Sequence, residues 1–307
     1  MRVTSNTYSN LVINSSQSSQ QQLAQIQQEI STGNTVQFAS DDPLTYQEAS
    51  QTQNTLAQLN AYTASAQVAT TATTANNSAM TSLHQLVANA SELATGATGT
   101  MSTSDLQNIG TEVSALLTQI TTIANQTDSS GNYMFGGTSN TAPLNTSTAA
   151  FNTGTNGTTS SIEVGQGNSV QTSIVAGNPT SGTSGFLYDS TSGVNVIAAI
   201  QQTVTDLNNG DATAVQSTDL PALNKALDLV SSYVGSTAAS MSAVTTATNS
   251  LTSQTTAATD QLNALTQTNL PTATIQLQQI QNQYEAALEA GSRVLQLSIM
   301  NYLATPT

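Results

Sequence analysis

Residues of the kinds that perform catalysis are scarce and scattered in this chain. It has 307 residues, no Cys and a single histidine, His84. A general base or a metal ligand needs partner groups, and the sequence clusters none near His84, which follows Leu83 in a stretch with helical periodicity. We therefore interpret His84 as a structural residue. Without Cys the chain has no disulfide, no thiolate nucleophile and no cysteine metal site.

Two pairs of carboxylates could in principle perform acid–base chemistry. Asp41 and Asp42 are adjacent and precede Pro43. Negative charge is favourable at the start of a helix, and proline fits the first helical turn, so we predict a helix start with Asp42 as its cap. Glu285 and Glu289 lie four residues apart with no basic residue between them. That spacing is typical of a solvated or interface face of a helix.

A glycine-rich loop with the sequence GNYMFGGTSNTAPL occupies residues 131–144. It lacks the Lys-Ser/Thr of a phosphate-binding loop, and its glycines are wrongly spaced for one. We predict instead a structural turn, in which the aromatic side chains fold a hairpin against the end of a helix and the glycines allow close backbone approach. The predicted turn residues are Gly131, Tyr133, Phe135, Gly136 and Gly137. No catalytic, metal or cofactor site remains, so we predict that the protein is not an enzyme.

The charge balance limits the possible partners. Three Lys and Arg residues stand against 17 Asp and Glu residues, for a formal net charge of −14. Binding to nucleic acid or to an acidic membrane surface requires several basic residues, so we exclude both. No apolar run approaches the roughly 18 residues of a membrane span. The N-terminal stretch has no apolar core of a cleaved signal peptide, so we expect any export to use another route.

Each end of the chain carries an amphipathic helical stripe. Successive members of each stripe are three or four residues apart, which is the period of a helix with one packing seam. On the N-terminal side the stripe runs through Val12, Ser16, Ser19, Leu23, Ile26 and Ile30, and we expect it to end at Gly33. On the C-terminal side it runs through Leu277, Ile280, Tyr284, Leu288, Gly291, Leu295, Ser298 and Tyr302.

Long helical patterns lie between these two ends. Residues 43–95 show no interruption and could form a single helix of about 80 Å. Further helical stretches are predicted over 104–123, from 194 to Asn209, and from Pro221, placed in a first turn, to about 268. Residues 141–193 are rich in Gly, Ser, Thr and Asn, and alternate only around 162–174, which predicts a small β hairpin.

These patterns predict a mainly α protein. We expect a long antiparallel helical rod with paired N- and C-terminal helical arms and a small inserted β domain. Its predicted parts are the arms, 1–42 with 272–307, the helical rod, 43–140 with 194–271, and the β-rich outer domain, 141–193. Because isolated helices are marginal in water, we also expect the arms to be disordered in a monomer and to fold on assembly.

Three stretches together resemble the bacterial flagellin superfamily, and in particular its hook-associated members. QEISTGNTVQFASDDPLTYQEASQ is similar to the family's Ser/Thr-Gly turn followed by Ser-Asp-Asp-Pro and a helix. The loop at residue 131 is similar to the family's Gly-x-Tyr-x-Phe-x-Gly-Thr motif. The tail YEAALEAGSRVLQLSIMNYL is similar to its C-terminal helix. Charged positions of the family are here replaced by Ser, Thr and Gln.

The resemblance implies a structural protein at the junction between the flagellar hook and the filament. It implies self-assembly into a ring, contacts with another hook-associated protein and with flagellin, and an export chaperone on the C-terminal arm. It also implies type III export and an extracellular location. The assembly seam would comprise Leu23, Ile26, Ile30, Leu277, Ile280, Tyr284, Leu288, Leu295 and Tyr302. The alternatives are a flagellin-type filament subunit and a secreted coiled-coil adhesin.

Overall fold

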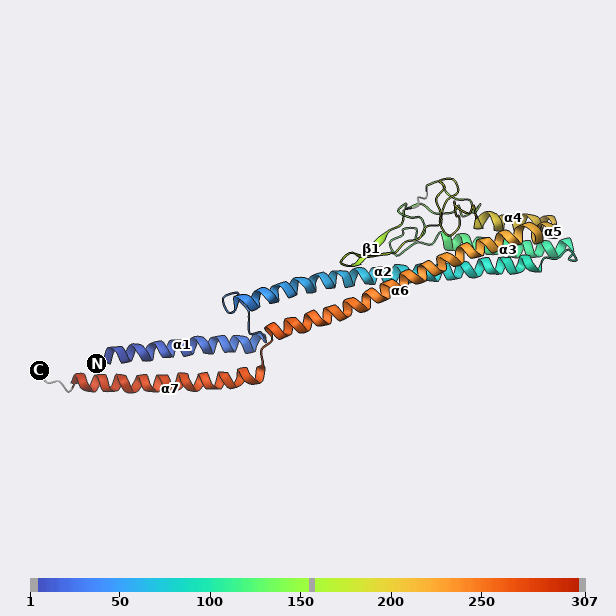
Figure 1. Cartoon of the computed structure of the whole chain (residues 1–307). Helices are drawn as coiled ribbons and strands as arrows, with labels where there is room; N and C mark the ends of the chain where they lie inside the picture. The colour runs from blue at the N-terminus through green and yellow to red at the C-terminus, as the bar shows by residue number, and fades with distance from the viewer. Residues whose placement is uncertain (1–4, 155–157, 304–307) are drawn as a thin grey trace. The chain divides into compact units, whose positions relative to one another are not determined.

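The computed structural model describes residues 5–154 and 158–303, and the predicted mainly α fold with a small sheet is confirmed (Figure 1). The chain forms two compact units: a terminal unit, residues 1–58 with 255–307, and a middle unit, residues 59–254. The predicted division between the arms and the rod falls at 42/43, immediately before the helix that begins at Pro43, and at 271/272, within the first turn of the helix that begins at Leu270. The two compact units instead divide within two long helices, α2 (Pro43–Gly96) and α6 (Leu220–Thr266).

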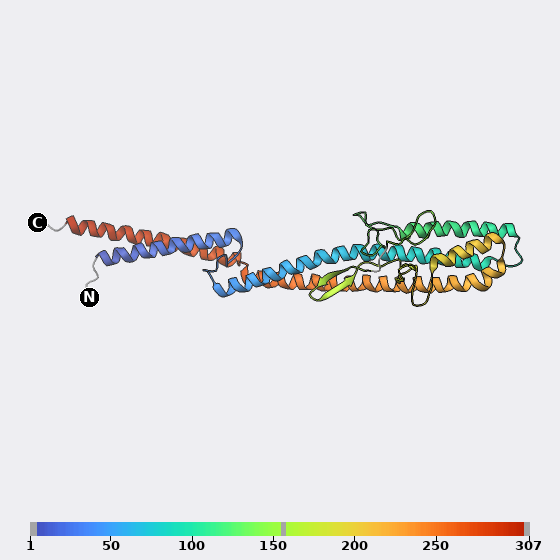
Figure 2. The same cartoon turned by 90° about the horizontal axis from the view of Figure 1, so that it is seen from above.

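The terminal unit pairs α1 (Ser5–Thr32) with α7 (Leu270–Leu303), side by side and in opposite directions (Figures 1 and 2). Gly33, with φ 74°, ends α1 as predicted, because glycine adopts this left-handed conformation without strain. The Thr268 amide donates to the Gly33 carbonyl at 2.9 Å, and the Thr35 amide donates to the Thr266 carbonyl at 2.7 Å. Each arm is thus a packing partner of the other in this structure, and the expectation that the arms are disordered in a free monomer stays a prediction.

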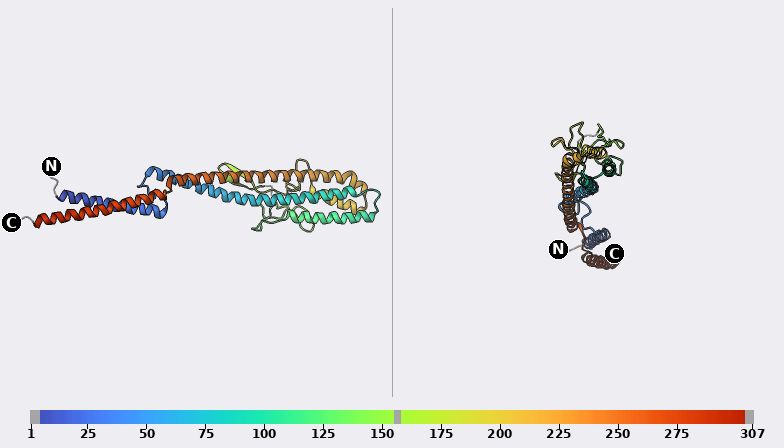
Figure 3. Two further views of the ribbon diagram at one scale, coloured as in Figure 1. Left: turned by 90° about the horizontal axis from the view of Figure 1, so that it is seen from below. Right: turned by 90° about the vertical axis from the view of Figure 1, so that its right-hand side faces the viewer.

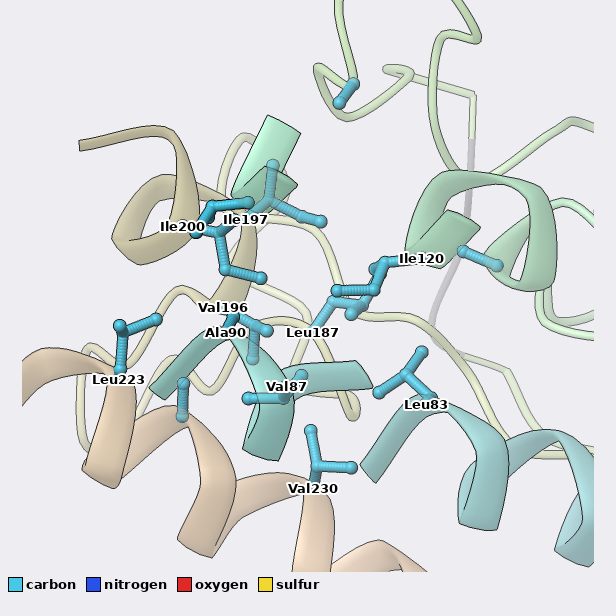
Figure 4. Close-up of a cluster of buried hydrophobic side chains, with 14 of the residues drawn as sticks. Leu83, Val87, Ala90, Ile120, Leu187, Val196, Ile197, Ile200, Leu223 and Val230 are labelled. Atoms are coloured by element: carbon cyan, nitrogen blue, oxygen red, sulfur yellow. The ribbon is translucent and has the colours of Figure 1, made fainter. Parts of the chain in front are cut away.

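The middle unit packs four helices around one apolar core. α2 and α6 run in opposite directions, with α3 (Thr103–Ala124) and α4 (Val196–Asn209) beside them (Figures 1 and 3). Figure 4 shows that the core side chains converge from all four helices. On α2, the side chains of Met80, Leu83, Val87 and Ala90 have no exposed surface. Among the described residues, no helix is long and apolar enough to cross a membrane.

In the described residues of the region predicted to be β-rich, 141–154 and 158–193, the two named strands form one hairpin. β1 (Ser161–Gly165) pairs antiparallel with β2 (Asn168–Gln171), with Ile162 opposite Val170. The other described segments of this region are irregular and lie along one side of the helices (Figure 3). Phe186 and Leu187 from this region have no exposed surface and belong to the same core as the helices. The hairpin region therefore folds as part of the middle unit.

The helix predicted to open at Pro221 has no separate start. Instead a short helix α5 (Ala212–Ala214) and a π-helical turn η1 (Val215–Asp219) lead directly into α6. Asp211 caps α5 by accepting from the Ala214 amide at 2.9 Å. Because Pro221 has no N–H and its ring crowds the preceding turn, a regular α-helix cannot pass through it undisturbed. The π-turn, with the Leu220 amide bonded to the Val215 carbonyl, accommodates this local disturbance.

Candidate functional site

The predicted seam on α1 is the face that α1 turns toward its partner helix. Its six positions are all buried or partly buried, and Ile26 is only 6 % exposed. The two serines of the stripe, Ser16 and Ser19, are partly buried as well. A strict alternation of three and four residues thus marks the face that packs within a single chain.

The buried face of α7 includes only some of the residues predicted for the seam. Leu277, Ile280 and Tyr284 are partly buried, but Leu288 is 50 % exposed and its neighbour Ala287 is partly buried instead. The side chains of Leu295 and Tyr302 lie outside the described residues. Beyond Ala287 the seam continues at Gly291, which is also partly buried.

Gly291 allows the two helices to approach closely. A methyl group at Gly291 would lie 3.0 Å from Cγ1 of Val12, which is closer than normal van der Waals contact. A side chain at this position would therefore push α1 and α7 apart. The sequence pattern placed both residues on the seam but did not predict that they face each other.

Large apolar side chains remain exposed on the α1–α7 pair. Leu11 is 63 % exposed, Ile13 is 53 % exposed and Ile275 is 57 % exposed. Single exposed apolar residues are ordinary, but these three and Leu288 all lie on the α1–α7 pair. We call Leu11, Ile13, Ile275 and Leu288 the exposed apolar set.

Charge contributes little to the helix pair. Within the described residues one ion pair is formed, between the Arg293 guanidinium and the Glu289 carboxylate at 2.7 Å. Both side chains are largely exposed, so this pair within α7 adds little stability. No basic residue lies between Glu285 and Glu289, and the basic partner of Glu289 is Arg293, one turn later in the same helix.

The predicted helix start has the geometry of a cap. Asp42 Oδ1 accepts from the amides of Leu44 and Thr45, and its Oδ2 accepts from the Thr45 hydroxyl at 2.7 Å. The hydrogen bond from the Thr45 hydroxyl is the main reason why the pKa of Asp42 lies below its usual value. Pro43 is the first residue of α2.

Asp41 has a different role from Asp42. Its Oδ2 accepts from the amides of Gln37 and Phe38, at 3.2 and 3.0 Å, and so closes the turn before the helix. The two carboxylates therefore bind backbone amides, which is a structural role. Among the described residues, no group of three or more His, Cys, Asp and Glu side chains could hold a metal ion.

The turn at residue 131 joins the helices to the irregular region through aromatic contacts. Phe135 is 1 % exposed, and its ring meets Phe186 edge-on with ring centres 5.1 Å apart. Phe186 in turn meets Tyr233 of α6 at 6.3 Å. Tyr133, which is partly exposed, forms a bridge with Thr127 and closes the hairpin. Burial raises the pKa of Tyr233 above its usual value.

Three glycines of this turn have distinct structural requirements. Gly131 and Gly137 have φ values of 82° and 71°, which side chains rarely adopt. Gly136 has an ordinary φ, but a methyl group there would lie 2.8 Å from the carbonyl oxygens of Ser139 and Thr141. The turn carries no charged side chain that could hold a phosphate, and the lone histidine, His84, is partly buried on α2.

Comparison with known proteins agrees with this arrangement at the N-terminal end. Residues 3–140 match the family described as the bacterial flagellin N-terminal helical region. The predicted resemblance to the flagellin superfamily is confirmed. Flagellar hook-associated protein 3 of Escherichia coli (strain K12) is 31 % identical over 119 residues, which is 38 % of this chain and 38 % of that protein.

Solved structures share the fold at low sequence identity. FlgL of Xanthomonas campestris has a TM-score of 0.58 and 17 % identity, and covers 69 % of this chain and 99 % of its own. FlgL of Bacillus cereus has a TM-score of 0.56 and 19 % identity over the same shares. The flagellar junction protein FlgL of Legionella pneumophila has a TM-score of 0.50 and 15 % identity, with 73 % and 99 % covered.

Proposed function

We propose that this protein is a structural component of the bacterial flagellum that joins the hook to the flagellin filament. The observation that carries the proposal is the antiparallel pair α1–α7, whose first helix lies within the match to the flagellin N-terminal helical region. The similarity to hook-associated protein 3 and to FlgL structures supports the junction role. The protein acts through assembly and carries out no catalysis.

In this proposal the exposed apolar set forms part of the contacts between subunits. Neighbouring copies in a ring, another hook-associated protein on the hook side and flagellin on the filament side would cover these side chains. Each apolar side chain fully removed from water contributes about 1.5–3 kcal/mol. With three basic residues in the whole chain, such contacts cannot depend on many ion pairs. Assembly should therefore persist at ionic strengths on the order of 1 M, where exposed charges are screened beyond about 3 Å.

We further propose that the protein is exported through the flagellar type III route and acts outside the cell. In this view a chaperone binds the C-terminal arm, within 272–307, before export and keeps it from pairing with the N-terminal arm. The separated arms would be only marginally helical, which suits passage through a narrow channel.

Deletion of the gene, followed by electron microscopy, tests the proposal. We expect cells that carry hooks without filaments and release flagellin into the medium, and we expect the wild-type gene to restore filaments. Complementation with Leu288→Asp should restore filaments poorly, whereas Gln281→Asp, at an exposed polar position of the same helix, should restore them fully. Normal filaments in the deletion strain would refute the junction role.

A filament subunit is the second candidate, because the family match covers a region that flagellins share. Immunogold labelling of an epitope-tagged chain separates the two roles. Label confined to a single position between hook and filament supports the junction role. Label along the whole filament supports the filament subunit.

A further inference from the structure

A buried carboxyl group lies at the π-helical turn that precedes α6. Asp219 ends η1, is 2 % exposed, and its Oδ2 has no hydrogen-bond partner among the described residues. Unpaired polar atoms are rare in protein interiors, because water no longer satisfies them. π-turns inside helices are often found at functional positions. Neither the proposed junction role nor the packing of the core explains this group.

The groups that act on Asp219 are also acidic. After burial, the charge of Asp206 of α4 and a side-chain hydrogen bond with it raise the pKa of Asp219, and Asp211, the cap of α5, adds a second negative charge. From α2, the contacts to η1 are neutral, since Gln216 Nε2 donates to the carbonyls of Ala94 and Ala97. On the α3 side, Gln107 donates to the Asn208 carbonyl. Lys225 and Asp228 of α6 are not among the groups that perturb Asp219.

Two carboxyl groups in contact can share one proton but cannot both ionise without strong repulsion. With the proton present, one carboxyl donates a hydrogen bond to the other and links α4 to η1. Burial, followed by the charge of Asp206, raises the pKa of Asp219 to about 6. Without the proton, Asp219 and Asp206 both carry negative charge and repel each other, and Asp211 adds to this repulsion.

We propose that the Asp206–Asp219 pair is a proton-dependent clasp that holds the α4–η1 corner closed in mildly acidic medium and lets it open at neutral and alkaline pH. A carboxyl whose folded-state pKa is raised stabilises the fold fully below its unfolded value near 3.8. That contribution is lost as pH rises through about 6. The corner can open locally, because the Gln216 contacts still hold η1 to α2.

Amide hydrogen exchange of the full-length chain at pH 5 and pH 8, corrected for the intrinsic pH dependence of exchange, tests the clasp. The protection factors of the backbone amides of residues 206–219 against hydrogen exchange should fall about tenfold or more from pH 5 to pH 8. Asp219→Asn keeps the shape but removes the ionisable group, so its protection should be the same at both. Asp228→Asn, which removes an exposed carboxylate of α6, should behave like the wild type.

Two further variants separate titration of this carboxyl pair from titration of the histidine and from a folding defect. Histidine is the side-chain type that ordinarily changes charge between pH 5 and 8, so the experiment is repeated in a His84→Gln background, where the fall should persist. If Asp219→Asn does not fold, Asp206→Asn is measured in its place. It removes the neighbouring charge and should reduce the loss of amide protection between pH 5 and pH 8. Equal wild-type protection at both pH values, or an unchanged fall in both Asn variants, would overturn the proposal.

Discussion

The terminal unit and the middle unit use similar helices but differ in how much apolar surface each one buries. In the described part of the terminal unit, the buried apolar residues are Ile26, Ala49 and Ala273. The middle unit buries a continuous cluster drawn from four helices and the irregular region, including Phe135 and Phe186. Burial of apolar side chains is the main source of folding free energy. We therefore expect the middle unit to be the more stable of the two when the chain is alone.

Truncating a leucine in each unit should give the largest difference between them. Leu83→Ala in the middle unit removes a side chain with no exposed surface, and should lower the free energy of unfolding by about 2–5 kcal/mol. Leu277→Ala removes a partly buried side chain of the helix pair and should lower it much less. Denaturant unfolding followed by circular dichroism measures both. Equal losses would contradict the contrast between the units.

Changes in the turn at residue 131 should have the next largest effect. Gly136→Ala places a methyl group against two carbonyl oxygens, and Gly137→Val forces a branched side chain into a left-handed conformation. Each should destabilise the middle unit by about 1–3 kcal/mol. Gly99→Ala is the control, because Gly99 has open space around it and no positive φ. If the turn variants had the same melting temperature as Gly99→Ala, the turn would tolerate side chains at these positions.

The exposed apolar set should matter for assembly and not for monomer stability. Leu11→Asp should change the free energy of unfolding by less than about 0.5 kcal/mol, since the side chain is 63 % exposed. It should weaken self-association at least about tenfold, because a buried leucine contributes about 1.5–3 kcal/mol. Sedimentation equilibrium measures association, and Asn10→Asp, exposed on the same helix, is the control. Unchanged association would remove Leu11 from the interface.

Two glycines inside helices should respond in opposite directions. Gly235 of α6 has nothing within 4 Å of an added methyl group, so Gly235→Ala should stabilise the chain by about 0.5–1 kcal/mol. A methyl group at Gly110 of α3 would lie 2.9 Å from Oδ1 of Asn208 and 3.2 Å from Cβ of Leu207. Gly110→Ala should therefore destabilise the α3–α4 contact. Thermal unfolding of both variants should show shifts of opposite sign.

Removal of the one described ion pair of the helix pair should have the smallest effect. Arg293→Gln keeps most of the length of the side chain and removes its charge, so stability should fall by no more than about 0.5 kcal/mol. Addition of salt should have a similarly small effect on the wild type. A loss of more than about 1 kcal/mol would mean that charge contributes to this helix pair more than its exposure suggests.

Local patterns determined the elements of this protein. The spacing of three or four residues predicted both terminal helices and the buried face of α1, because a helix repeats every 3.6 residues whatever it packs against. Asp42 as a cap, Gly33 as a helix end and a hairpin within 162–174 were also predicted, since each depends on residues a few positions apart.

Contacts between distant residues were decided only by the tertiary structure. Ala287 replaces Leu288 on the seam because the packing geometry of α7 against α1 selects the position, and hydrophobicity alone does not. Gly185 has no positive φ, yet a methyl group there would lie 2.2 Å from the Gly177 amide nitrogen. In the sequence, nothing distinguishes Asp219 from the other polar residues before Pro221. Asp219 is buried, and Asp206 acts on it, because α4 folds back against η1. A sequence pattern determines the period of each helix, but which residues pack against that helix is determined by the folding of the whole chain.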